Sequence, residues 1–180
     1  MLRQYPYVVA SLPLLEFGGE LPMTADDLVE YCSELVHPDD LAALRLVVAG
    51  RLEEVRQPAV RWYLQRDVQL RNAVARQRAA RVGVDATRYL RPHEGWDVEA
   101  EEVATQAMSV IDPLERELLL DRLRWRWLEE LAAMPAFGVQ ALHSYALRLR
   151  LLEAWQARTD ERGAAVAREI IDSNIAEISV

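Results

Sequence analysis

The sequence predicts an all-α protein that folds as a single helical domain over residues 1–180. Hydrophobic residues recur at helical spacing along most of the chain, and proline and glycine separate the periodic segments. The composition, with 51% hydrophobic and 28% charged residues, is sufficient for a core and a solvated surface. We therefore expect about six to seven helices arranged around a central helix. A division into two small helical lobes near residues 83–97 is the alternative.

Residues 111–134 form the predicted central helix. Asp112 and Pro113 supply an N-cap and a first-turn proline, and no further glycine or proline occurs until Pro135. At about 100° per residue, the apolar side chains form two stripes on nearly opposite sides. Two stripes favour a helix between two layers, whereas a single wide face with exposed tryptophans is the alternative. The stripes are Leu114, Leu118, Trp125, Leu128 and Ala132, and Leu119, Leu120, Leu123, Trp127, Leu131 and Met134.

The first 57 residues are predicted to contain an arm and two helices. Residues 5–17 show no helical period, which leaves a short strand or an irregular apolar arm. Thr24 and Asp27 have capping-box spacing, which predicts a helix over 25–36. Pro38 then starts a second helix, whose apolar positions continue to Val55 through a weak point at Gly50.

Three further helices complete the prediction. Pro58 begins the longest, which ends near Val82 because Gly83 is a helix-ending signal. After a loop over 84–97, helices are expected over 98–110 and 139–158, the second with heptad-like apolar spacing. A turn at 160–163 then precedes a final helix that ends near Asn174.

Charged residues lie within the apolar face of the predicted helix 58–82. Asp67 and Arg71 can pair at i, i+4, whereas Arg78 has no acid within its own turn. Glu117 or Asp121 of the central helix could neutralise Arg78. A structural ion network is favoured over a partner-docking or anion site, because an unpaired buried charge is costly. The candidate residues, structural or partner-binding, are Asp67, Arg71, Arg78, Arg81, Glu117 and Asp121.

The sequence contains no motif of catalytic, cofactor or metal chemistry. The absence of lysine excludes a Walker A loop, and neither GxGxxG nor GxSxG occurs. His37, His93 and His143 are scattered without metal-ligand spacing. We therefore expect no catalytic residues, no cofactor and no metal. The single cysteine, Cys32, indicates a reducing compartment and hence a cytoplasmic location.

The net charge of −8 conceals an uneven distribution along the chain. Residues 1–44 hold one arginine and eight acids, residues 45–91 hold eleven arginines and four acids, and residues 92–180 hold nine arginines and seventeen acids. A nucleic-acid-binding domain is usually basic overall, so this pattern favours internal neutralisation and no nucleic acid. No apolar run approaches the roughly 20 residues of a membrane span, so no direct membrane insertion is expected.

Four segments together resemble a known protein family. They are YPYVVASLPLLEF from Tyr5, WYLQRDVQLRNAVARQRAARVG from Trp62, DPLERELLLDRLRWRWLEEL from Asp112 and FGVQALHSYALRLRLLEAW from Phe137. They resemble a bacterial family without an assigned activity, whose members are encoded alongside subunits of V/A-type rotary ATPases. The segment Leu70, Arg71 and Asn72, with Arg78 and Arg81, is also similar to the helical C subunit of those ATPases, called d in eukaryotes. That subunit seats the central stalk on the membrane rotor ring.

The resemblance implies a non-catalytic structural or assembly component of a bacterial V/A-type ATPase. Such a component would connect stalk or rotor subunits and would lie in the cytoplasm, or peripherally at the cytoplasmic membrane through the complex. It implies no catalytic residues. The contacts with ATPase subunits are expected at Arg71, Arg78, Arg81 and any exposed side chains among Trp62, Trp96 and Trp125.

Two other hypotheses remain open from the sequence. One is a free-standing helical enzyme or ligand-binding protein with a pocket lined by Asp67, Arg71, Arg78 and His143. The other is a homodimer formed through the heptad-like face of residues 139–158.

Overall fold

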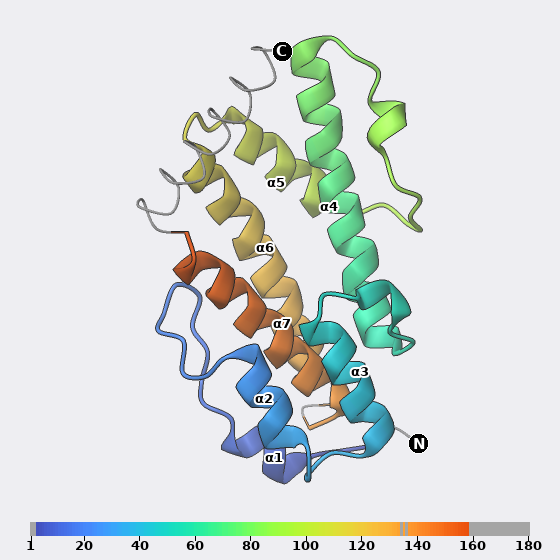
Figure 1. Ribbon diagram of the computed structural model, residues 1–180. Coiled ribbons are helices and arrows are strands. Elements are labelled where there is room, and N and C mark those ends of the chain that lie inside the picture. The colour runs from blue at the N-terminus through green and yellow to red at the C-terminus, as the bar shows by residue number, and fades with distance from the viewer. Residues whose placement is uncertain (1–2, 134, 136, 159–180) are drawn as a thin grey trace, which may run out of the picture.

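The computed structural model describes residues 3–133, 135 and 137–158, and this part of the chain is all-α (Figure 1). Two short 3-10 helices, η1 (Leu52–Glu54) and η2 (Ala86–Tyr89), accompany the α-helices. The final helix expected to end near Asn174 lies outside the described residues. The α-helices are α1 (Pro6–Ser11), α2 (Ala25–Cys32), α3 (Pro38–Val48), α4 (Pro58–Val82), α5 (Val98–Ser109), α6 (Pro113–Ala133) and α7 (Val139–Gln156).

Helix α6 is the central helix that the sequence predicts. It packs against α4 and α5 on one side and against α7 on the other (Figure 1). Trp125 and Trp127, which belong to different predicted stripes, are both buried. Arg122 and Arg126 lie on an exposed edge between the two packed faces. The two-layer interpretation is therefore confirmed, and the alternative with exposed tryptophans on α6 is wrong.

The buried apolar residues form one continuous core to which all seven helices of the described chain contribute. The segment between α4 and α5 joins two helices that pack directly on each other. Gly83 ends α4 with φ +69°, a left-handed conformation that glycine adopts without steric cost. A single helical domain accounts for these contacts.

The N-terminal arm is irregular over residues 12–16, as one sequence alternative predicts, but residues 6–11 form the short helix α1, which neither alternative predicts. Pro6 occupies the first turn, where its fixed φ favours a helix. Val8 is the one buried residue of α1. Gln4 forms an isolated antiparallel bridge with Gly138, beside which the Tyr5 amide donates to the Phe137 carbonyl at 2.7 Å.

Helices α2 and α3 end earlier than the sequence predicts. Helix α2 ends at Cys32 rather than at residue 36, and a turn leads from it to Pro38. Helix α3 ends at Val48 rather than near Val55, because Gly50 has φ +74° and leaves the helical conformation. Apolar periodicity beyond Gly50 therefore reflects packing of η1 against the core and not a continued helix.

His143 is fully buried in the core on α7. Neither of its ring nitrogens has a hydrogen-bond partner among the described residues. Burial disfavours the charged imidazolium and lowers the pKa of His143 to about 4, although the charge of Asp40 opposes this shift. The side chain is thus held neutral in the folded protein at neutral pH.

We predict that the His143→Leu variant loses stability less steeply on acidification than the wild-type protein. The folded-state pKa lies below the ordinary value of 6.5, so the unfolded chain binds more protons between these two values. The contribution of neutral His143 is complete above the unfolded pKa and is lost as the pH falls towards the folded pKa. Between pH 7 and pH 5 the wild-type protein should lose about 2 kcal/mol more than the variant in urea titrations. Equal losses in the two proteins would contradict this assignment.

Candidate functional site

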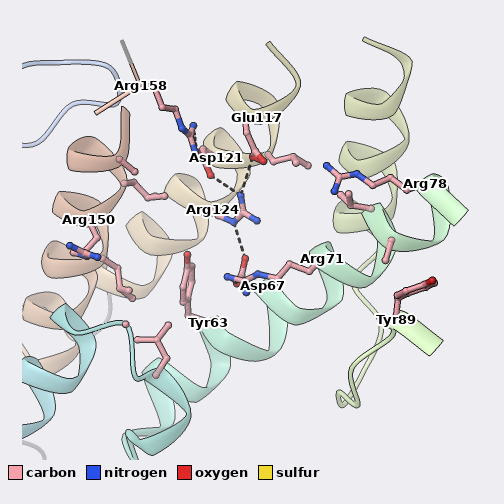
Figure 2. A pocket seen from close by; sticks show the side chains of 18 of the residues that line it. Tyr63, Asp67, Arg71, Arg78, Tyr89, Glu117, Asp121, Arg124, Arg150 and Arg158 are labelled. Carbon is pink, nitrogen blue, oxygen red and sulfur yellow. Dashed lines mark hydrogen bonds and ion pairs between the residues drawn. The ribbon is translucent and has the colours of Figure 1, made fainter. Parts of the chain in front are cut away.

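Helices α4 and α6 are joined by a buried ion network centred on Arg124 (Figure 2). The Nε atom of Arg124 donates to Oδ1 of Asp67 on α4 at 2.8 Å. Its Nη1 atom donates to Oδ1 of Asp121 on α6 at 2.6 Å. Both carboxylates are almost completely buried, with side-chain exposure of 4% each. Arg124 therefore bridges two acids that would be costly to bury without a cation.

Further donors complete the network at its outer edge. Arg71 of α4 pairs with Oδ2 of Asp67 at 2.7 Å, which is the i, i+4 pair predicted from the sequence. Oδ2 of Asp121 accepts from the Trp155 indole at 3.0 Å and from Arg158 at 3.4 Å, so α7 is also tied in. Each buried carboxylate thus has a partner on a second helix, which favours one fixed arrangement of α4, α6 and α7.

The electrostatics of the network keep Arg124 charged. Burial alone lowers the pKa of this guanidinium, but the carboxylates of Asp67 and Asp121 outweigh that effect and raise the pKa above its ordinary value. The neighbouring Tyr63 is buried, and desolvation together with the charge of Asp67 raises the pKa of its hydroxyl. Arg124 consequently stays positively charged between the two carboxylates.

A groove of about 900 Å³ lies over this network between α4, α6 and α7 (Figure 2). Its walls combine charged and apolar side chains. The apolar lining includes Leu120, Leu147 and Leu151. At the C-terminal end of α4 it also includes Val82, with Val84 and Tyr89 from the segment that follows. The charged lining residues are Asp67, Arg71, Arg78, Glu117, Asp121, Arg124, Arg150 and Arg158.

The structure brings five of the six sequence-predicted site residues to this groove and leaves one outside it. Arg81 is exposed at the end of α4 and donates to the backbone carbonyl of Met108. Arg78 is exposed rather than embedded in an apolar face, and it makes no ion pair within the described part of the chain. The expected pairing of Arg78 with Glu117 or Asp121 is wrong: Asp121 bonds to Arg124 at 2.6 Å instead, and Glu117 remains 41% exposed at 3.9 Å from Arg124.

Sequence reasoning missed Arg124, the residue on which the network depends. The i, i+3 spacing of Asp121 and Arg124 could have indicated this ion pair, because it places both side chains on one side of α6. What the sequence did not reveal is that this side faces Asp67, which is 57 positions away along the chain. His143, expected in an arginine-lined pocket, lies in the core instead and does not line the groove.

A second groove, of about 930 Å³, lies between α4 and the loop before α5. Trp62 and Trp96 line it, with 38% and 64% of their surfaces exposed. The guanidinium of Arg66 lies 4.5 Å from the Trp62 ring and pairs with Asp97 at 2.8 Å. Trp125, the third expected contact residue, is buried and donates to Glu129 at 2.9 Å, so it is unavailable to a partner.

Within residues 3–133, 135 and 137–158, no group of three His, Cys, Asp or Glu side chains could hold a metal ion. No helix of the described chain is both long and apolar enough to cross a membrane.

Comparison with known proteins gives one match. Residues 98–178 match the model of a family described as a protein of unknown function (DUF2764). The match begins at the first residue of α5 and includes α6 and α7, so it contains Asp121 and Arg124 but not Asp67 or Arg71. This part of the chain is therefore similar to an uncharacterised family, and the expected link to V/A-type ATPase subunits stays a prediction. No curated protein and no solved structure matches the chain.

We predict that Arg124→Met destabilises the protein by about 3 kcal/mol, because it leaves two buried carboxylates without their shared cation. The measurement is the free energy of unfolding from urea titration at pH 7. Arg122→Met removes the same charge from the exposed edge of α6 and should change stability by less than about 0.5 kcal/mol. Equal effects of the two substitutions would show that the network does not hold α4 to α6.

Proposed function

We propose that this protein is a non-catalytic structural or assembly component of a bacterial V/A-type ATPase, to whose subunits it binds as a rigid helical connector. The observation that carries the ATPase assignment is the resemblance of four segments, spread from Tyr5 to Trp155, to a family encoded with those subunits. A position between central stalk and membrane rotor, by likeness to the C subunit, is the finer form of the proposal. The protein would then be cytoplasmic or peripheral to the membrane through the complex.

The ion network supports a connector role. A connector must keep its shape while its partners exert force on it, and the bonds of Asp67 and Asp121 to Arg124, with that of Trp155 to Asp121, tie three helices together. The buried charged side chains of Asp67, Asp121 and Arg124 bond to one another and so serve to hold the helices together. Such an arrangement favours a protein that binds partners over one that catalyses a reaction with these groups.

The exposed tryptophans supply a suitable contact surface for an ATPase subunit. Tryptophan and arginine are the residue types most enriched in the energetically dominant parts of protein interfaces. Trp62 and Trp96 line one groove together with Arg56, Arg61 and Arg66. Burial of both rings by a partner would remove exposed apolar surface that is costly in water.

The proposal is tested by affinity purification of the tagged full-length protein from its native host. We expect ATPase subunits to co-purify, and we expect a strain that lacks the protein to assemble less intact ATPase. If the native ATPase never contains the protein and its assembly is unchanged in the deletion strain, the proposal fails.

We further predict that Trp62→Ala combined with Trp96→Ala weakens binding to the purified ATPase at least about tenfold, because truncation of an interface tryptophan costs about 2 kcal/mol. Surface-immobilised ATPase and the purified variant give the dissociation constant. Tyr7→Ala is the matched control, since Tyr7 is a highly exposed aromatic residue that lines neither groove. Loss of binding in the control, or none in the double variant, places the contact elsewhere.

A second candidate function is the binding of a small anionic ligand in the groove over the ion network. The observation in its favour is Arg78, which is exposed at this groove without an ion pair among the described residues. A ligand of this kind would raise the melting temperature of the free protein, by mass action, at millimolar inorganic phosphate or pyrophosphate. A melting temperature that is unchanged by either anion at constant ionic strength would remove this candidate.

A further inference from the structure

We propose that the groove between α4, α6 and α7 receives an acidic amphipathic helix from a partner protein. The inference rests on the proposed role as an interaction protein, and it names the surface and the chemistry of the segment that is bound. It does not depend on the identity of the partner as an ATPase subunit.

The groove runs along one face of a long helix. Helix α4 lines it with one continuous face that includes Tyr63, Arg71, Arg78 and Val82. Tyr63 is buried, so the exposed part of this face runs from Arg71 to Val82 and extends for about 17 Å at 1.5 Å per residue, which corresponds to about three turns of a bound helix. Ala75 on the same face is partly exposed, and its small side chain permits close approach of a second helix.

The accessible charge of the groove is predominantly positive. Five arginines line it against three acids, although the whole chain has a net charge of −8 and Arg150 is paired with Glu153 at 3.1 Å. Two of the acids, Asp67 and Asp121, are buried and already bonded to Arg124. Arg71 keeps 59% of its side chain exposed beside its ion pair, and Arg78 is exposed as well. Acidic side chains of a partner would find complementary charges here and no free carboxylate except Glu117.

The apolar lining distinguishes a helix from a small anion. Val82, Val84 and Tyr89 line one end of the groove and are exposed by 73%, 50% and 60%. A phosphate-sized ligand would leave these side chains in water. An amphipathic helix would cover them with its apolar face and would bring its acidic flanks to Arg71 and Arg78, which is the common helix-in-groove mode of recognition.

The test places a photocrosslinking amino acid at Ala154 in the full-length protein in its native host. Ala154 is an exposed residue of α7 that lines the groove. The same amino acid at Ala80 is the control, because Ala80 is exposed on α4 and is not part of the groove lining. We expect mass spectrometry to show that Ala154 cross-links to a segment with helical apolar periodicity and an excess of Asp and Glu. The yield should exceed that at Ala80 at least tenfold.

Charge exchange then tests the recognition itself. The cross-linked segment is made as a peptide, and its dissociation constant for the full-length protein is measured. Arg78→Glu should weaken binding of this peptide at least about tenfold. The control Arg122→Glu, on the outer edge of α6, should leave its affinity unchanged. A peptide in which one acid is changed to lysine should restore binding to the Arg78→Glu variant. Failure of Arg78→Glu to weaken binding would overturn the inference.

The remaining outcomes separate this inference from the proposed function. Cross-links from Ala154 to residues 159–180 of the same chain, to a segment without excess acid, or at the yield of Ala80 would overturn it. Co-purification with the ATPase could still persist in each of those cases. Conversely, an acidic helix from a protein outside the ATPase would support the groove inference and count against the ATPase assignment.

Discussion

The bridge that Arg124 makes between Asp67 and Asp121 is the interaction on which the rest of the structure depends. Two buried carboxylates on different helices repel each other and have lost their hydration, so one cation between them fixes the distance of α4 from α6. The apolar core could tolerate small shifts between these helices, whereas a planar guanidinium that donates to one carboxylate on each helix tolerates few. The network thus selects one packing among several that burial alone would permit.

The long helices were predictable because their signals are local. Caps, prolines and apolar periodicity over 58–82 and 113–133 lie within the segments themselves, and α4 and α6 agree with them. Helix α1 and the end of α3 were not predictable in the same way. The Tyr5 amide bonds to Phe137, whose position the sequence does not reveal, and the left-handed conformation of Gly50 depends on how η1 packs.

In the candidate site, too, contacts within one helix were predictable from the sequence and contacts between helices were not. The Asp67–Arg71 pair lies within one turn and was predictable, whereas the partner of Arg78 was assigned wrongly to the acids of α6. Arg124 is connected to Asp121 through i, i+3 spacing on the same helix, so it reaches that carboxylate at little entropic cost. A helical wheel gives the side on which Arg124 lies but not the helix that faces it.

The pairing of Arg124 with Asp67 and Asp121, which the sequence did not predict, also determines which charges of the groove are accessible to a ligand. Arg124 supplies one positive charge to the two buried acids, and Arg71 and Arg158 at the outer edge supply the remainder, so that Arg78 keeps its charge for the surface. Asp67 holds Arg71 in a fixed position, so a partner that binds it loses less side-chain freedom than it would with a free arginine. Arg78 has no such restraint in the described chain and can adjust to the acid that it meets. The groove therefore combines one preorganised and one adaptable cation along a single helix face, an arrangement that favours a partner with acids spaced along a helix over a single compact anion.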